Sequence, residues 1–526
     1  MLRFLRTNVS VEKDRGKVII FIVFCLFSMC IDVVVTYLNG SFIDQIVKRN
    51  NIEQLLNYSV ILISGYVMSI VFRYIYGVVS TILREKLSFS LVSKLIEHLH
   101  YIPLLELKKY EASYLTERIY SDSSDIINFV LDNGIMFVIN GVIGMSLIFY
   151  VSITNMRVSV VFICFLPIYI LIYVFSGNKL AHKTEQVKES QNIFYQKMYE
   201  QISLTENIKV EASFRENDSY IRKIHDIYIK KFLEYTQMNE GIKALENLVS
   251  YGFYAVLLVL GVKEIVAGNL TLGEFTVINA YFNRVISIIS YYLDFGKNLK
   301  QVDVSLKRIQ ELFDIKSEHN GDIILNEIEN IKIKKLSYKY PDSKELILKN
   351  INYTFKKNNI YIIRGLNGNG KSTLGKIIVG LLENIDDVYI NGYDIRRLDM
   401  YMLRKKVISI LNQKIQFPYD KIKNIIEEKH YDTIQYLMKE DNFNLKEYLN
   451  SYPEELSGGQ LQKLYLYKIL QEKKQVLILD EPTSALDGQS TKILFKILQK
   501  IKKGRIIIII THDMNFEKIA DGILNL

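Results

Sequence analysis

The sequence contains few of the residues that stabilise a small secreted or metal-binding domain. Its three cysteines, Cys25, Cys30 and Cys164, all lie inside apolar runs. An odd number of cysteines in such surroundings argues against both a disulfide framework and a zinc site. Only six prolines occur among 526 residues, which leaves little room for a rigid linker. No internal repeat, Pro-rich tract or low-complexity segment is evident.

A concentrated basic surface is also missing. The net charge of +9 comes mostly from lysines scattered among acidic residues, without an arginine-rich arm or a basic stripe. Nucleic acid is therefore not an expected partner. What the chain has instead is apolar surface: 49% of its residues are hydrophobic, which is high for a purely soluble protein. A membrane part is expected.

Six apolar stretches precede residue 300, each near the ~20 residues that cross about 30 Å of hydrocarbon. They lie at about 18–38, 56–82, 128–151, 158–176, 247–266 and 273–295. The first is too long for a signal-peptide core and ends without a small-residue cleavage pattern, so it should remain as an anchor. Lysine and arginine gather on one side, so both termini and the long loops 83–127 and 177–246 should face the cytosol. Apolar residues at helical spacing predict that these loops are helices. The expected location is the cytoplasmic membrane.

Several ionisable residues fall within the apolar runs, among them Asp32, Arg73, Asp132, Glu274 and Arg284. A charge at membrane depth is costly unless it faces protein, water or a partner. At ~1.5 Å per residue, Asp32 lies about 21 Å from the cytosolic start of its span and Arg73 about 15 Å from the cytosolic end of the next. The two could therefore meet. A structural ion pair, a contact with a substrate and misplaced span boundaries all remain open.

The apolar runs stop near residue 310, and a polar stretch, 311–328, separates the membrane part, 1–310, from a second domain, 329–526. In that domain short strands alternate with amphipathic helices, which is typical of an α/β domain around a largely parallel sheet. Gly365–Thr373 reads G-x-x-x-x-G-K-[ST] and follows a strand-like apolar run. In this pattern backbone N–H groups face a phosphate, Lys371 reaches the outer phosphates and Ser372 holds Mg²⁺. A bound nucleotide is predicted.

Two further apolar runs end in polar residues suited to phosphate chemistry. Val476–Leu479 is followed by Asp480 and Glu481, and Ile506–Ile510 leads to His512. Ligands of open α/β sheets bind at the carboxyl ends of the strands. One carboxylate can hold Mg²⁺ and the other can orient or deprotonate the attacking water, while the imidazole reaches the same edge.

A second phosphate site is predicted at Leu456–Gln460, where a serine and two glycines open a helix. One domain has no use for two γ-phosphate sites on one nucleotide. A head-to-tail pair of domains solves this, because each presents this helix to the nucleotide held by the other.

Together these motifs resemble an ABC transporter, of the exporter type in which each half-transporter fuses its membrane domain ahead of its ATPase. The resemblance covers nearly the whole chain. The ATP-binding residues that it implies are Tyr340, which stacks on adenine, Gly365, Asn367, Gly368, Gly370, Lys371, Ser372 and Thr373 of the Walker A loop, Gln413 of the Q-loop, Ser457, Gly458, Gly459 and Gln460 of the signature, and Asp487 of the D-loop. It also implies Mg²⁺ on Ser372, Gln413 and Asp480, and catalysis by Glu481 as base with Lys371 and His512.

The membrane half carries weaker marks of the same family. Ser113–Arg118, followed by Asp122, resembles the first coupling loop, and Glu200–Lys209 resembles the second. Leu272–Phe275, which opens the last span, is also similar to exporters.

The resemblance implies a multi-domain membrane protein with an all-α six-helix transmembrane domain followed by an α/β P-loop ATPase domain. Two copies, or this chain and a homologous half-transporter, would bind two ATP molecules with Mg²⁺ and export cargo by alternating access. The Lys-, Ile-, Asn- and Tyr-rich composition suggests a Firmicute-like bacterium, where short half-transporters often export peptides such as bacteriocins. A peptide is therefore favoured as cargo, and a lipid or hydrophobic drug is the alternative. The leader before the first span contains no Cys or His, so no N-terminal peptidase is expected.

Two readings from other classes remain. A soluble ABC ATPase of repair or translation would carry two nucleotide domains and no spans, so the apolar runs argue against it unless they form a buried bundle. A sensor or immunity protein that binds ATP without moving cargo remains open. Substrate-stimulated hydrolysis would separate it from a transporter.

Overall fold

The computed structural model describes residues 4, 15–48, 52–110, 112–341, 343, 345–366, 368–382, 387–411, 420–426, 444–484, 486 and 488–526. The chain forms two compact units. The first comprises Met1–Glu97 and Ala112–Asp314, and the second comprises His98–Glu111 and Ile315–Leu526. The short segment 98–111 thus folds with the second unit although it connects two helices of the first.

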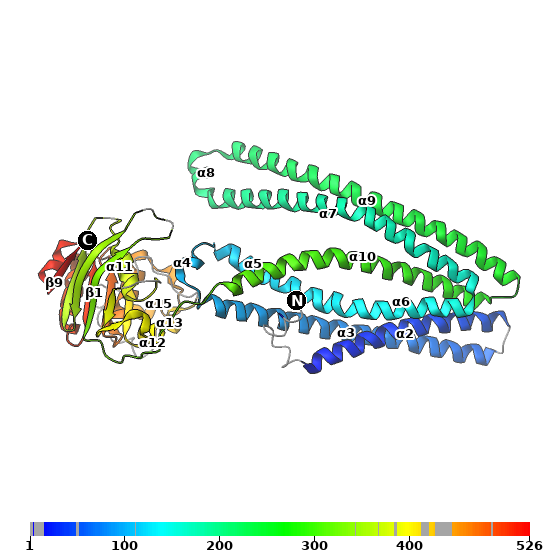
Figure 1. Ribbon diagram of the computed structural model, residues 1–526, viewed down its shortest axis with the longest axis horizontal. Helices are drawn as coiled ribbons and strands as arrows, with labels where there is room; N and C mark the ends of the chain where they lie inside the picture. The colour runs from blue at the N-terminus through cyan, green and yellow to red at the C-terminus, as the bar shows by residue number, and fades with distance from the viewer. Residues whose placement is uncertain are drawn as a thin grey trace. The chain divides into compact units, whose positions relative to one another are not determined.

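The first unit consists of long helices (Figure 1). They are α2 (Arg15–Val47), α3 (Ile52–Leu99), α5 (Ala112–Asn128), the π-helical turn η2 (Phe129–Gly134), α6 (Ile135–Thr154), α7 (Met156–Ser203), α8 (Thr205–Glu211), α9 (Phe214–Val266) and α10 (Leu272–Asp314). Figure 1 shows α7 and α9 side by side, with α8 joining them at one end. The helices predicted in the two long loops are confirmed, because α3, α7 and α9 all continue far beyond their apolar runs.

Among the described residues, five helical segments are long and apolar enough to cross a membrane. They are Arg15–Val47, Ile52–Leu99, Arg118–Thr154, Met156–Gly177 and Phe214–Val266, and they contain the first five predicted spans. The sixth predicted span, 273–295, lies on α10, which is one continuous helix but is less apolar than the other five. The count of six crossings therefore stays a prediction.

Ion pairs join helices within the first unit. The Arg73 guanidinium lies 2.9 Å from the Asp32 carboxylate, which also accepts a hydrogen bond from Ser69. The predicted meeting of Asp32 and Arg73 is confirmed. A second pair joins α3 to η2, where one nitrogen of Arg84 lies 2.9 Å from each oxygen of Asp132.

The second unit contains two sheets. Strands β6 (Ile408–Leu411), β7 (Val476–Asp480), β8 (Ile506–Ile510), β3 (Asn359–Arg364) and β9 (Gly522–Asn525) form a parallel sheet in that order. Strands β2 (Leu348–Lys356), β1 (Asn330–Tyr338), β4 (Val388–Ile390) and β5 (Tyr393–Asp394) form an antiparallel sheet in that order. The three apolar runs that were predicted to be buried strands are β3, β7 and β8, and every residue of β7 and β8 is buried.

Helices pack around this parallel sheet. The longer ones are α11 (Lys371–Ile378), α12 (Met400–Lys406), α16 (Gly458–Gln471) and α17 (Gly488–Ile501), and α13 (Ile422–Ile425) and α15 (Leu445–Tyr448) are single turns. Short 3₁₀ turns are η3 (Ile395–Arg397), η6 (Pro453–Glu455) and η7 (Met514–Lys518). Gly375 lets α11 lie close to the sheet, because an added Cβ there would come within 3.2 Å of Ile510. The expected α/β architecture is confirmed.

The segment expected to be a linker, 311–328, divides between the two units. Helix α10 continues to Asp314, and the residues after it belong to the second unit. The N–H of Ile323 donates to Arg397 O at 3.0 Å, and Ile328 is fully buried in the second unit's core. Most of this stretch is therefore part of the folded second unit rather than a free connection.

Candidate nucleotide site

The loop between β3 and α11 has the backbone shape that a phosphate cradle requires. Gly368 and Gly370 have φ of +89° and +81°, a region that L side chains rarely adopt. A Cβ on Gly370 would also come within 2.5 Å of Ile347. Helix α11 starts directly afterwards at Lys371, so the positive end of its dipole and its free N–H groups border the loop.

Lys371 is folded back over this loop. Its ammonium donates to the carbonyls of Gly365 at 2.8 Å and Leu366 at 3.1 Å. It also lies 2.9 Å from His512 Nε2, which must accept because an ammonium has no lone pair. The only positive charge in the loop is thus held at the point where strands β3 and β8 end.

Two carboxylates lie beside this loop at the end of β7. Asp480 is buried, and burial raises the pKa of its carboxyl above the ordinary value even though a hydrogen bond from Ser372 lowers it. Glu481 follows in a left-handed conformation with φ of +50°. Its carboxylate accepts a hydrogen bond from Thr511 at 3.3 Å and lies 3.8 Å from His512 Nε2. The register that pairs Asp480 with Ile510 brings these side chains together.

These groups line one pocket of about 360 Å³. Its lining residues are Tyr340, Ile347, Gly368, Gly370, Lys371, Ser372, Thr373, Asp480, Glu481 and His512. The hydroxyls of Tyr340 and Thr373 lie 3.1 Å apart, so the predicted adenine-stacking residue is tied to α11. Three predicted site residues, Asn367, Gln413 and Asp487, lie outside the described residues.

The signature segment lies apart from this pocket. Ser457 is the N-cap of α16: its hydroxyl accepts from Gln460 N–H, and the Gln460 side chain accepts from Ser457 N–H at 2.9 Å. Ser457 and Gly458 are exposed, and none of 457–460 lines the pocket. Within one chain the structure brings together the loop, the strand ends and Tyr340, but not the signature.

One residue beside the site was not predicted. Gln462, buried on α16, donates hydrogen bonds to the Glu481 carbonyl at 3.1 Å and to Ser484 Oγ at 3.0 Å. It therefore connects the signature helix to the segment that carries Glu481. The only sequence signal was its place two residues after the signature.

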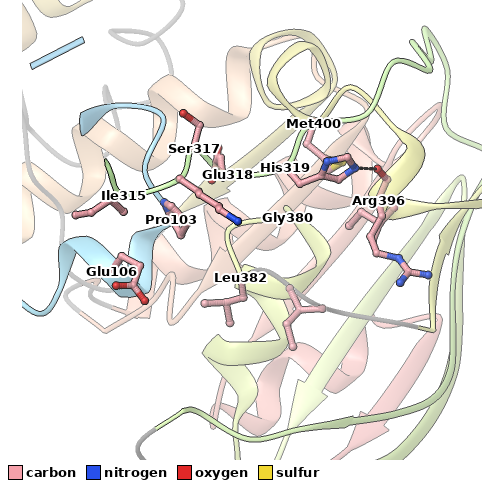
Figure 2. Close-up of a pocket in the computed structure, with 13 residues that line it drawn as sticks. Pro103, Glu106, Ile315, Ser317, Glu318, His319, Gly380, Leu382, Arg396 and Met400 are labelled. Carbon is pink, nitrogen blue, oxygen red and sulfur yellow. Dashed lines mark hydrogen bonds between the residues drawn. The ribbon is translucent and has the colours of Figure 1, made fainter. Parts of the chain in front are cut away.

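A second pocket, of about 590 Å³, lies at the other end of α11 (Figure 2). Pro103 and Glu106 of the segment that contains α4 (Leu104–Leu107) line one side, and Gly380 and Leu382 line another. Leu105 packs against the core of the second unit. This segment, and not Ser113–Asp122, is the part of the first long loop that folds with the second unit, because Ala112–Asp314 belongs to the first unit. The four residues of α4 carry no motif that distinguishes them.

Comparison with protein families defines the class of the chain. Residues 18–289 match the ABC transporter transmembrane region, and residues 348–484 match the ABC transporter family model. The first match alone spans more than half of the chain. The chain therefore belongs to the ABC transporter family, as a multi-pass membrane protein with an ATP-binding domain whose ATP hydrolysis is coupled to transport.

Individual relatives place it among exporters. It is 23% identical to the lactococcin-A transport/processing ATP-binding protein LcnC of Lactococcus lactis subsp. lactis, over 99% of this chain and 74% of that protein. It is 26% identical to an alpha-hemolysin translocation ATP-binding protein, HlyB, of Escherichia coli, over 84% of this chain and 64% of that protein. A solved structure of a bacterial Atm1-family ABC exporter with ATP bound is similar in fold, with a TM-score of 0.81 at 16% identity, covering 97% of this chain and 93% of that one.

Proposed function

We propose that this chain is an ATP-driven exporter of small peptides that works by alternating access. The observation that carries the proposal is the similarity, over 99% of the chain, to a protein named for lactococcin-A transport. A second relative is named for alpha-hemolysin translocation. Both halves of this chain take part, because the matches include the membrane region as well as the ATPase.

The pocket at the strand ends performs the hydrolysis. Lys371 neutralises charge on the γ-phosphate. The His512 imidazole, whose Nε2 lies 2.9 Å from the Lys371 ammonium, contacts the same phosphate. Glu481 accepts the proton of the attacking water, because it is the less buried carboxylate of the pair at the end of β7 and lines the pocket. Thr511 orients this carboxylate through its hydrogen bond.

Mg²⁺ fits the residues beside Lys371. The Ser372 hydroxyl and the buried Asp480 carboxylate line the same pocket, and both carry the hard oxygen donors that this ion prefers. Among the described residues no cluster of three or more His, Cys, Asp or Glu could hold a metal ion. Two protein ligands suit an ion that takes its other ligands from phosphates and water. When bound, it would neutralise charge on the β- and γ-phosphates.

A second copy, or a homologous half-transporter, completes each site. At the N-terminus of α16 the backbone N–H groups of Gly458 and Gly459 have no acceptor within the helix, and neither residue lines the chain's own pocket. These groups suit the γ-phosphate of ATP held by the other domain. ATP would therefore close two domains upon each other.

The segment at 98–111 passes this motion to the membrane helices. It connects α3 to α5, and its Tyr101 carbonyl accepts a hydrogen bond from Glu318 N–H at 2.6 Å within the second unit. Helix α11 carries Lys371 at one end and borders the pocket beside α4 at the other. A shift of α11 on ATP binding would thus reach this segment. In this arrangement both termini of the chain lie in the cytosol.

The proposal is tested by ATP hydrolysis in lipid nanodiscs, with the wild-type chain and candidate peptides, lipids and dyes. We expect peptides to stimulate hydrolysis. If only lipids or dyes stimulate ATP hydrolysis, the cargo is a lipid or a hydrophobic drug and not a peptide. Hydrolysis that no cargo changes would favour a sensor that binds ATP without transport.

A further inference from the structure

Helix α10 differs from the other membrane helices in what its exposed side carries. Helix α6 exposes Val138, Val142, Met145 and Phe149, and α9 exposes a similar apolar set. Among the described side chains, α10 exposes no large hydrophobic residue between Leu272 and Leu299. A helix side that faces lipid is apolar, so this side of α10 is not a lipid-facing surface.

Polar residues occupy that side instead. Thr276, Asn283, Arg284 and Ser287 are all exposed or partly exposed, and their spacing of seven, one and three residues places them on one side of a helix. The opposite side carries Ile278, Phe282, Val285 and Ile289, which are buried in the core of the bundle. The polar side of α10 therefore faces away from its own bundle.

Arg284 stands out on this side because it has no partner. Arg73 pairs with Asp32, Arg84 pairs with Asp132, and Arg157 pairs with Glu264, all at 2.9 Å. Within the part of the chain that the structure describes, Arg284 makes no hydrogen bond and no ion pair. An arginine in a membrane span is costly without a counter-charge or water, so an anionic group or an aqueous path is expected beside it.

Its depth limits what that group can be. Arg284 follows Leu272 by twelve residues, or about 18 Å along the helix, near the middle of a hydrocarbon layer of about 30 Å. The Tyr281 hydroxyl donates to the carbonyl of Val33, next to Asp32, so Arg284 lies roughly one helical turn from the level of the Asp32–Arg73 pair. A lipid phosphate stays at the membrane surface, whereas cargo passes through the middle.

We infer that Arg284 binds a carboxylate of the transported peptide, either its C-terminus or an acidic side chain. The guanidinium presents paired N–H donors that match the two oxygens of a carboxylate. Asn283 and Ser287, one turn apart on the same side, donate to the carbonyls of Asn279 and Asn283, so their side-chain oxygens can accept from the N–H groups of a peptide backbone. The inference rests on the proposed function and names the group by which the membrane unit recognises its cargo.

The test uses the full chain in nanodiscs of neutral phosphatidylcholine. The probes are two synthetic ten-residue apolar peptides without Asp or Glu, identical except that one ends in a free carboxylate and the other in an amide. The concentration that gives half-maximal stimulation of ATP hydrolysis is measured for each peptide, relative to each variant's own basal rate. For the wild type we expect the carboxylate form to act at a concentration about tenfold lower.

Three variants at one position sharpen the test. Arg284→Gln should make the two peptides equal, Arg284→Lys should keep part of the preference, and Arg284→Glu should reverse it. The double change Asp32→Asn, Arg73→Gln is the matched control, because it removes an arginine at similar depth without altering net charge. It should keep the wild-type preference.

Several results would overturn the inference. If both peptides stimulate the wild type equally, the carboxylate site fails while the export of peptides stands. If neither peptide acts at any concentration, the proposed function fails and the inference fails with it. A preference that survives Arg284→Gln, or that appears only with anionic lipid, would place the recognition elsewhere. A loss of dimer in Arg284→Glu, with the peptide preference unchanged, would assign Arg284 to a contact between two copies.

Discussion

The two units of this chain encode their chemistry in different ways. In the second unit, the reactive side chains directly follow buried strands, and parallel pairing of β3, β7 and β8 brings the loop, the carboxylates and His512 to one edge. In the first unit, charges 41 or 48 residues apart meet across helices, and Arg284 has no partner among the described residues. A reactive site at strand ends can therefore be predicted from short sequence motifs. A recognition site on a helix face can be identified only when the packing and the exposure of its residues are known.

The largest effect is expected at the strand ends. Glu481→Gln should lower ATP hydrolysis by about 10²- to 10⁴-fold, because the amide cannot take a proton from water. ATP should still bind and remain trapped. Turnover and retained nucleotide measure this directly, and Glu327→Gln, an exposed glutamate paired with Lys357, serves as the control. If the Glu481→Gln variant hydrolyses ATP at the normal rate, Glu481 is not the catalytic base.

The next effect concerns the connection between the signature helix and Glu481. Gln462→Leu conserves volume but removes the hydrogen bonds to the Glu481 carbonyl and to Ser484. We expect kcat to fall about tenfold with a smaller change in KM, since a lost buried hydrogen bond of roughly 1–3 kcal/mol misplaces the base. Gln499→Leu, on the exposed side of α17, should change neither value. If kcat is unchanged in Gln462→Leu, the contact of Gln462 with Glu481 and Ser484 does not position the base.

In the first unit, the Asp32–Arg73 pair is expected to stabilise the fold, in contrast to Arg284, which is proposed to bind cargo. Asp32→Asn leaves an unpaired arginine in the membrane and should lower stability by roughly 2 kcal/mol. The double change Asp32→Asn, Arg73→Gln should recover at least half of that loss. Thermal unfolding in nanodiscs measures both. Equal damage from the single and double changes would show that the two residues do not act as a pair.

The smallest expected effect is the pH dependence set by Asp480. Because burial raises the pKa of this carboxyl, its contribution to stability is present at low pH and is lost as pH rises through the raised pKa. Without Mg²⁺, Asp480→Asn should therefore be more stable than the wild type at pH 7.5, by on the order of 1 kcal/mol or about 2–4 °C in a domain of this size.

Mg²⁺ and ATP should reverse that order, because the ion needs the ionised carboxylate. Their stabilisation of the wild type should be larger at pH 7.5 than at pH 5, and absent in Asp480→Asn. Asp322→Asn, an exposed aspartate of the same unit, is the control. A metal-free Asp480→Asn variant that is less stable than the wild type at pH 7.5 would contradict this account.

The sequence predicts the site of the second unit better than it predicts the surroundings of the helices in the first unit. The runs at 360–363, 476–479 and 506–510 are apolar and rich in β-branched residues, so their strands and the polar residues after them could be placed without a structure. Gln462 could not be placed, since its contacts with Glu481 and Ser484 join residues about 20 positions apart through the packing of a helix on a strand end.

In the membrane unit, the sequence predicts where the helices lie along the chain but not which residues surround them. Five of the six spans and the meeting of Asp32 with Arg73 follow from hydropathy and helical rise. The folding of 98–111 with the second unit did not, because α4 is only four residues long and the sequence around Ser113 resembled the coupling loop more closely. The polar side of α10 needed the exposed fraction of each residue, which composition does not contain.

The most direct test of the account is ATP-dependent uptake of a fluorescent ten-residue peptide into inside-out proteoliposomes that contain the purified chain. The account predicts uptake that requires ATP and is absent with Glu481→Gln, although that variant still binds ATP. Folded protein that hydrolyses ATP without moving any peptide, or uptake that persists in the Glu481 variant, would contradict it.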